Sequence, residues 1–427
     1  MVFLSGTLGF KCPQALAFCS KIHMDFKPRT RCLHNPFSRS PPRELLPTED
    51  GSSITLQEWQ GWGTTSPLPT IVTRIADELK DLEKDSDEKM TFGGKGGKIK
   101  GDFKKQEDKK HRETYRGLGD SEQKLQFFSA RQIACRLVGS RGYLCQKCWL
   151  PHEDCMCSKV TPCKLWHGIR FWLYMHPKDF LRQNNTGKLL WQLFGVEAAT
   201  LCLFGIAEQE EIMWNAFKCA GKDKVWCLYP NKSGVVKSVQ EAFDQGLSTD
   251  LGFAETTTNG HDILNFVLID GTWSNSAAMV RRLKDQSEHP YKNAHKNELV
   301  SPKGVAQMDQ AKLAWGEEDI CFISLAAGAS AMHKLRPQPS WDRTCTAAAA
   351  VGLLYELQLL PKFCSIGLDK QAEAIEDTLA VLLDALTARR LRMGRLTYSW
   401  LLGTLRMVST PNTGKNKART NTNYRYL

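Results

Sequence analysis

The segment FVLIDGTW, residues 266–273, decides the fold class of this chain. Four apolar residues ending in Asp270 are typical of a buried strand that delivers one carboxylate to the carboxyl edge of a sheet, where ligands bind in open α/β proteins. Gly271 lets a neighbouring backbone approach closely, and the helical pattern NSAAMVRRL follows at 275–283. On these residues alone, Asp270 is open to two interpretations, a helix cap or a catalytic carboxylate.

Short apolar runs alternate with helical patterns on both sides of this segment. The other strand-like runs are IRFWLYMH at 169–176, ATLCLFGI at 199–206, VWCLYP at 225–230 and ICFISL at 320–325. The helical patterns between and after them include GKLLWQLFGV at 187–196, VVKSVQEAF at 235–243 and TAAAAVGLLYELQLL at 346–360. Strands separated by helices predict an α/β domain with a largely parallel sheet and helices on both faces.

Four cysteines fall in two close pairs, and they are Cys145, Cys148, Cys155 and Cys157. Four thiolates at this spacing can close a tetrahedral site with no open position, so they predict a structural zinc knuckle. Cys163 remains an alternative ligand. Fifteen cysteines in a chain of 427 residues without a secretory pattern also favour a reducing compartment over a disulfide framework.

The charge balance favours a polyanionic partner without identifying one. Lys and Arg outnumber Asp and Glu by 57 to 46, a formal net charge of +11. No uncharged apolar stretch reaches the roughly 18 residues that a membrane span needs, so no membrane partner is expected.

The sequence divides into five segments. Residues 1–43 carry seven Lys or Arg against one acid, so they are either an organelle transit peptide or a disordered basic leader. A transit peptide would place the protein in a chloroplast or mitochondrion, and otherwise the cytoplasm or nucleus is expected. Residues 44–120 are expected to be a mostly disordered Lys/Gly-rich linker with one helix at 68–82, because the tract 90–116 has almost nothing to bury. A helix and the zinc knuckle fill residues 121–165, the α/β domain spans 166–390, and a basic tail follows at 391–427. The polar stretches 245–261 and 285–318 look like surface insertions within the α/β domain.

Two further loops offer ligand contacts. The run NTGKL at 185–189 lacks the first glycine and the Ser or Thr of a phosphate loop, so it is interpreted as a helix start capped by Asn185 or Thr186. Before the last long helix, Arg336 and Arg343 can face a carboxylate or phosphate, although surface arginines beside a Thr344 or Thr346 cap explain them as well.

In their order along the chain, these motifs resemble the DTW-domain family, the tRNA-uridine aminocarboxypropyltransferases. The resemblance spans roughly residues 145–360. It rests on the C-x2-C and C-x-C pairs, His176-Pro177, Asn185 to Gly187, Tyr229-Pro230, the D-x-T-W motif at 270–273, Arg336 and Thr346.

The resemblance implies a SPOUT-like α/β fold with a knotted carboxyl-terminal half and S-adenosylmethionine as the co-substrate. It also implies tRNA as the partner and 3-(3-amino-3-carboxypropyl)uridine as the product. The implied catalytic residues are Asp270, Thr272 and Trp273. The implied cofactor-binding residues are Thr186, Gly187, Tyr229, Pro230, Gly271, Arg336 and Thr346. Oligomeric state is left open.

Two positions depart from the family pattern. Asp179 stands where the family usually has Glu, and Ala347 and Ala348 follow Thr346 where a Glu is usual. Two other functions are compatible with the sequence. One is a methyltransferase on the same scaffold, which would release S-adenosylhomocysteine. The other is a zinc-stabilised RNA-binding protein without enzymatic activity.

Overall fold

The computed structural model describes residues 54–84, 90–93, 98–230, 236–244, 263–288, 320–325 and 344–394. The proposed leader, most of the two insertions and residues 395–427 of the tail lie outside the described residues. Within the described part, every helix is too short or too polar to cross a lipid bilayer.

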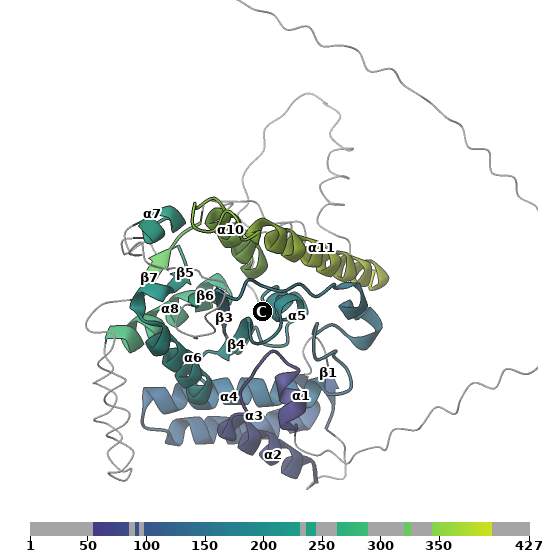
Figure 1. The fold of residues 1–427 in the computed structure, drawn as a ribbon. Coiled ribbons are helices and arrows are strands. Elements are labelled where there is room, and N and C mark those ends of the chain that lie inside the picture. The colour runs from purple at the N-terminus through teal and green to yellow at the C-terminus, as the bar shows by residue number, and fades with distance from the viewer. Residues whose placement is uncertain are drawn as a thin grey trace, which may run out of the picture. The chain divides into compact units, whose positions relative to one another are not determined.

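The centre of the fold is a sheet of five parallel strands in the order β4-β3-β6-β5-β7 (Figure 1). The strands are β3 (Ile169–Met175), β4 (Ala199–Leu203), β5 (Val225–Leu228), β6 (Leu264–Asp270) and β7 (Cys321–Ile323). Each overlaps a run predicted from the sequence, so the α/β class and the parallel sheet are confirmed. Because β6 is the middle strand, its last residue, Asp270, emerges at the centre of the carboxyl edge.

Helices cover both faces of the sheet, which explains why the strands are apolar on both sides. In β3, Phe171 and Leu173 pack into one core while Trp172 and Tyr174 pack into the other. The first core is closed by α5 (Lys188–Phe194), α7 (Val239–Asp244), α10 (Thr346–Gln358) and α11 (Leu368–Arg392). The second is closed by α6 (Ala207–Ala220) and α8 (Trp273–Glu288). Single turns of 3-10 helix span His152–Asp154, Cys157–Lys159 and Lys222–Lys224.

The region before the sheet differs from its prediction. It forms α1 (Leu56–Gln60), α2 (Thr70–Lys84), a two-stranded hairpin of β1 (Phe92–Gly93) and β2 (Lys98–Ile99), α3 (Gly101–Gly117) and α4 (Ser121–Ser140). The predicted helices at 68–82 and from Ser121 are confirmed as α2 and α4. The expectation of disorder through the lysine tract is wrong for 101–117, which is helical.

The packed face of α3 is built from residues that look polar in the sequence. Phe103 and Glu107, one helical turn apart, are both buried. Glu107 pairs with Arg131 of α4, and the ring of His111 stacks on Phe127 with centroids 5.0 Å apart. Burial lowers the pKa of His111 to about 4. The α3 helix therefore packs through Phe103, through the ion pairs of Glu107 and Asp108 with Arg131, and through a neutral histidine.

The segment after α1 protects the outer edge of the sheet. The carbonyl of Gly63 accepts a hydrogen bond from the amide of Leu201 in the edge strand β4, at 3.0 Å. Gly63 has a φ of +104°, and a Cβ there would lie 2.7 Å from the ring of Trp191. Glycine is required at this position for both reasons, and the contact blocks an edge that another chain could otherwise extend.

A buried ion-pair network fixes α8, the helix that follows Asp270. Arg282 donates to Glu210 of α6 at 2.6 Å and to Glu122 of α4 at 2.5 Å. The Glu210 side chain is 2% exposed and also accepts the Tyr174 hydroxyl at 2.6 Å. The network ties three helices and the central sheet together.

Replacing Arg282 by Met should lower the free energy of unfolding by about 3–5 kcal/mol, because Glu210 would stay buried without its cation. Urea unfolding measures the loss. Arg281→Met is the matched control, since Arg281 is exposed on the same helix, and its effect should stay within about 0.5 kcal/mol. Equal unfolding midpoints for the two variants would contradict the role given to the network.

Candidate active site and metal centre

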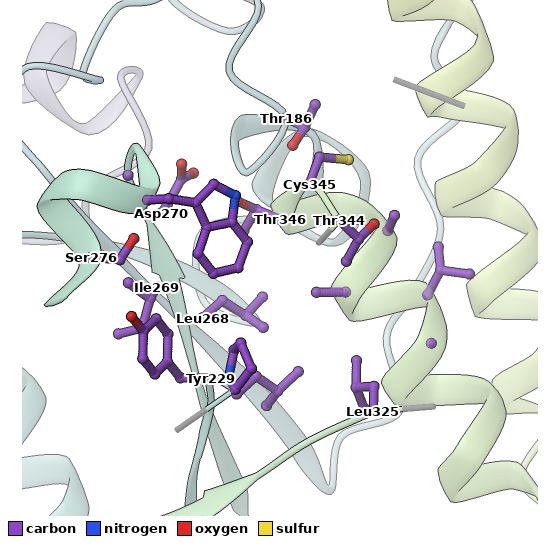
Figure 2. A pocket seen from close by; sticks show the side chains of 18 of the residues that line it. Thr186, Tyr229, Leu268, Ile269, Asp270, Ser276, Leu325, Thr344, Cys345 and Thr346 are labelled. Carbon is purple, nitrogen blue, oxygen red and sulfur yellow. The ribbon is translucent and has the colours of Figure 1, made fainter. Parts of the chain in front are cut away.

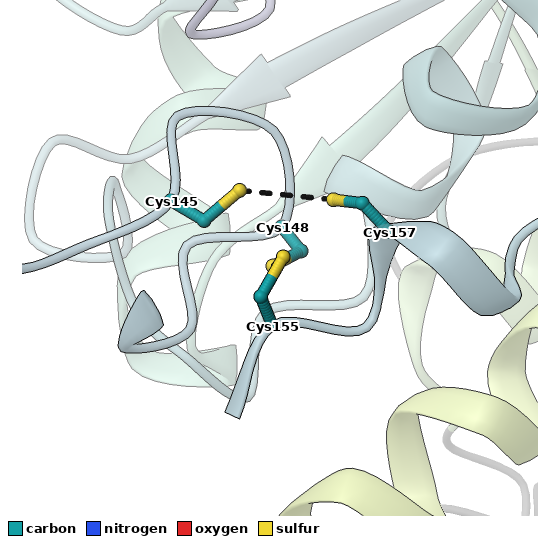
Figure 3. A group of neighbouring side chains, drawn as sticks. All are labelled: Cys145, Cys148, Cys155 and Cys157. Atoms are coloured by element: carbon teal, nitrogen blue, oxygen red, sulfur yellow. Dashed lines mark hydrogen bonds between the residues drawn. The ribbon is translucent and has the colours of Figure 1, made fainter. Parts of the chain in front are cut away.

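The sulfur atoms of Cys145, Cys148, Cys155 and Cys157 converge on one point (Figure 3). The Sγ–Sγ distance is 3.7 Å between Cys145 and Cys157 and 3.8 Å between Cys148 and Cys155, and all four atoms lie within 4.8 Å of one another. A tetrahedral zinc ion with Zn–S bonds of about 2.3 Å places its ligands about 3.8 Å apart. The four-cysteine group therefore fits a tetrahedral metal ion.

A tight turn positions the first pair of these cysteines. The amide of Trp149 donates to the carbonyl of Cys145 at 2.8 Å, and Trp149 adopts a left-handed φ of 56°. The indole of Trp149 is fully buried and contacts Phe180 edge-on. Cys163 lies outside the group, and its thiol donates to the carbonyl of Lys164. The structure thus favours the four paired cysteines over Cys163 as ligands.

A cavity of about 400 Å³ opens at the carboxyl edge of the sheet (Figure 2). It is lined by the ends of β5, β6 and β7, by the loop that follows β3 and by the first turns of α10. In Figure 2, Asp270, Thr186 and Thr346 lie at one end and Leu325 at the other. Asp179, Arg182 and Thr272 also line the cavity and are joined to one another by hydrogen bonds. Aliphatic side chains from β5, β6, β7 and α10 line much of the rest. We call this the carboxyl-edge cavity.

Asp270 is the most perturbed carboxyl group of the cavity. Its side chain is 6% exposed, and both of its oxygens accept from the Asn185 amide, at 2.9 and 3.0 Å. Burial raises the pKa of Asp270 to about 7, against the opposing effect of the Asn185 hydrogen bond and with the charge of Asp179 adding to the rise. A carboxyl group with this pKa can exchange a proton near neutral pH.

Gly187 and Thr186 bring the start of α5 against Asp270. A Cβ at Gly187 would lie 2.0 Å from Oδ2 of Asp270, so only glycine fits there. The predicted cap of α5 is wrong, because Gly187, not Asn185 or Thr186, occupies the N-cap position. Asn185 still accepts the first amide of this helix, from Lys188 at 3.1 Å. The Thr186 hydroxyl instead accepts the amide of Ala347 in α10, at 3.3 Å.

The predicted cap of α10 is wrong. Cys345, not Thr344 or Thr346, occupies the N-cap position, and it makes no side-chain capping bond. Thr186 from another segment takes over this function. The Thr346 hydroxyl bonds to Asp270, and the Thr344 hydroxyl oxygen is buried without a partner among the described residues. Both threonines line the cavity.

Asp179 links the end of β3 to the turn after β6. Its Oδ2 accepts the amide of Thr272 at 3.2 Å, and its other oxygen pairs with Arg182. The shorter side chain that departs from the family pattern therefore still reaches this turn. Arg182 lines the cavity and was not identified from the sequence, where its spacing four residues before Thr186 carried no recognised motif.

Trp273 and Tyr229 form an aromatic wall of the cavity. Their ring centroids are 6.3 Å apart with the planes tilted by 35°. Both residues are only partly buried and both line the cavity. Flat, accessible rings at a ligand cavity can stack on a nucleobase.

Lys188 faces inward rather than toward a phosphate. Its side chain is fully buried, and its ammonium group donates to the carbonyl of Gln183 at 2.5 Å. Burial lowers the pKa of Lys188 to about 7. This placement agrees with the rejection of a nucleotide triphosphate loop at 185–189.

Most of the residues singled out from the sequence gather at this one cavity. Those that line it are Thr186, Tyr229, Pro230, Asp270, Gly271, Thr272, Trp273 and Thr346. Gly187 touches Asp270 directly. Arg336 and Arg343 lie outside the described residues, so their suggested contacts stay predictions. Ala348 lines the cavity, so α10 presents no carboxylate at this position.

Comparison with known proteins assigns the family. The DTW domain matches residues 142–391, more than half of the chain. The chain belongs to the DTW-domain family. The match confirms the resemblance drawn from the motifs, and the DTW domain includes both the four-cysteine group and the carboxyl-edge cavity. No solved structure matches the chain.

The purified protein should contain about one tetrahedrally bound metal ion per chain, since the four-cysteine group is closed by its own thiolates. Elemental analysis measures the content. Cys148→Ser should lose the metal, whereas Cys163→Ser, the control outside the group, should retain it. Equal metal content in the two variants would rule out the four cysteines as the ligand set.

Asp270 should also make the free energy of unfolding depend on pH, in a direction that follows from its pKa. Its folded pKa of about 7 lies above the ordinary value of 3.8, so its contribution is present at low pH and is lost as the pH rises through 7. Between pH 5 and pH 8 the wild-type protein should lose about 2–3 kcal/mol more unfolding free energy than Asp270→Asn. Urea unfolding of both proteins at the two pH values measures this difference. Parallel pH dependences would show that the carboxyl group is not perturbed.

Proposed function

We propose that this protein transfers the 3-amino-3-carboxypropyl group of S-adenosylmethionine to N3 of a uridine in tRNA. The observation that carries the proposal is Asp270, a buried carboxyl group with a pKa near 7 at the intact D-x-T-W turn of a DTW domain. It lines a cavity large enough for a small cofactor, next to two accessible aromatic rings.

The carboxyl-edge cavity fits the cofactor in size and polarity. Its aliphatic part suits an adenine ring, and its polar end suits the charged tail of the methionine moiety. The buried hydroxyl oxygen of Thr344 has no partner among the residues that the structure describes, which supports a ligand contact there, because buried polar atoms are normally hydrogen-bonded. Thr186, Tyr229, Pro230, Gly271 and Thr346 are the lining residues proposed to hold the cofactor.

Asp270 is proposed to act on the uridine. N3 of uridine is a weak nucleophile until its proton is removed, and Asp270 Oδ is proposed to accept that proton. N3 then bonds to the chain carbon attached to sulfur, the carbon–sulfur bond breaks, and its electron pair leaves on sulfur in methylthioadenosine. The hydrogen bonds from Asn185 hold the carboxylate in place for this step. Positioning of the two substrates should supply most of the rate enhancement.

Trp273 is proposed to stack on the target base, and Thr272 to help fix the turn that carries Trp273. Binding of tRNA is supported by the net charge of +11 and should weaken with salt. Recognition should rest on RNA shape and on an unstacked loop base.

The four-cysteine group is proposed to hold a structural zinc ion, because its closed set of thiolates leaves no position for a substrate. A SPOUT-like topology with a knotted carboxyl-terminal half is also proposed for the DTW domain. The connection 326–343, on which such a knot would depend, lies outside the described residues.

Asp270→Asn should reduce formation of the modified uridine by about 100-fold or more, because it removes the proton acceptor. Mass spectrometry of nucleosides from tRNA incubated with protein and S-adenosylmethionine measures the product. Asp285→Asn, an exposed position on α8, is the matched control and should retain activity.

The same assay tests the other functions. A methylated uridine with S-adenosylhomocysteine as the by-product would identify a methyltransferase. An unmodified tRNA that the wild-type protein still binds would identify a binding protein without activity. Undiminished product from Asp270→Asn would exclude Asp270 as the proton acceptor.

A further inference from the structure

The charges around the carboxyl-edge cavity are unequal. The acidic lining residues are Asp179, Asp270 and Glu376, whereas Arg182 is the one cation among the lining residues that the structure describes. Its side chain is 41% exposed, so part of the guanidinium is accessible from the cavity. A ligand that carries an anionic group therefore has one described partner for that group.

The position of Arg182 is fixed by its ion pair with Asp179. The Nη1 atom of Arg182 donates to Asp179, whose side chain is 6% exposed and whose second oxygen accepts the amide of Thr272. A guanidinium carries five N–H donors in a planar fork, so one side can bind Asp179 while another faces the cavity. Arg182 is thus tied to the turn that follows Asp270.

A second guanidinium strengthens the positive potential at this point. Arg136 of α4 donates to the carbonyl of Phe180, two residues before Arg182. Burial and the charge of Arg182 lower the pKa of Arg136 to about 10, whereas the charge of Asp179 acts in the opposite direction. This end of the cavity therefore combines a proton acceptor, Asp270, with a site that attracts a carboxylate.

We infer that Arg182 binds the α-carboxylate of the S-adenosylmethionine tail and thereby places the aminocarboxypropyl chain, rather than the adenosine, beside Asp270. The inference rests on the proposed function and names the residue that sets the orientation of its cofactor. A carboxylate taken out of water needs a charged partner, and the fork of an arginine matches its two oxygens. The link from Arg182 through Asp179 to Thr272 fixes the tail relative to the reacting base.

Calorimetric titration of three ligands tests this contact. S-adenosylmethionine has the full tail, decarboxylated S-adenosylmethionine lacks only the carboxylate, and methylthioadenosine lacks the whole chain. Arg182→Gln should weaken binding of S-adenosylmethionine by about 10- to 100-fold, because a charge-assisted hydrogen bond is lost. Affinity for the other two ligands should change by less than about threefold. Arg182→Lys, which keeps the charge, should recover part of the loss.

Lys178→Gln is the matched control, since Lys178 is an exposed cation on the same segment and does not line the cavity. It should leave all three affinities unchanged. An equal loss of affinity for all three ligands in Arg182→Gln would show that Arg182 only shapes the cavity, and would overturn the inference. Unchanged affinity for S-adenosylmethionine with weaker tRNA binding would overturn it in favour of a phosphate contact.

The experiment separates this inference from the proposed reaction, because it uses neither RNA nor turnover. Selective loss of S-adenosylmethionine binding, together with a methylated product in the nucleoside assay, would leave Arg182 as the carboxylate partner while the aminocarboxypropyl transfer failed. A wild-type protein that binds none of the three ligands would overturn both.

Discussion

The pair formed by Asp270 and Asn185 is the contact on which the site depends. A carboxyl group at 6% exposure would strongly favour its neutral form, and the Asn185 amide offsets part of that cost by donating to both oxygens. The same Asn185 accepts the first amide of α5, so its orientation is set by the helix. The result is a carboxyl group whose two protonation states are close in free energy near neutral pH, because burial and hydrogen bonding act in opposite directions.

The four-cysteine group and the cavity are connected through α5. Lys188 begins this helix, and its buried ammonium group lies 5.9 Å from the centre of the Trp149 ring, in the turn of the four-cysteine group. Four thiolates around a divalent ion leave a net negative charge, which favours a nearby buried cation. The charges of both the cysteines and Asp270 act on Lys188 and raise its pKa against the effect of burial. Lys188 therefore joins the turn of the four-cysteine group to the loop that precedes α5, through its contact with Trp149 and its hydrogen bond to Gln183.

The sequence predicted the features that depend on neighbouring residues, and it missed those that depend on contacts between distant segments. The strands, most helices and the four cysteines follow from local periodicity and spacing, and the D-x-T-W order pointed to Asp270. The α3 helix was missed because its buried face uses Glu107 and His111, whose partners are on another helix. Arg182 was missed for a similar reason, since its relation to Asp179, Thr272 and the cavity exists only after folding. Thr186 as the acceptor for α10 is also a contact between segments 161 residues apart.

The charge pattern of the cavity is compatible with the cationic co-substrate that we propose. Asp179 and Asp270 lie at one end with Arg182, while Glu376 lines the cavity from α11. A sulfonium and an ammonium group add two positive charges, and a single carboxylate adds one negative charge, so this ligand would offset the excess of acids around it. Ala348 affects the same charge balance. A further carboxylate at that position would add a like charge to a cavity that already contains Asp179 and Asp270, and would raise the pKa of Asp270 further. The two departures from the family pattern therefore leave the acidic end of the cavity intact. Asp179 has a shorter side chain that still reaches Thr272. Ala348 adds no further carboxylate beside Asp179 and Asp270.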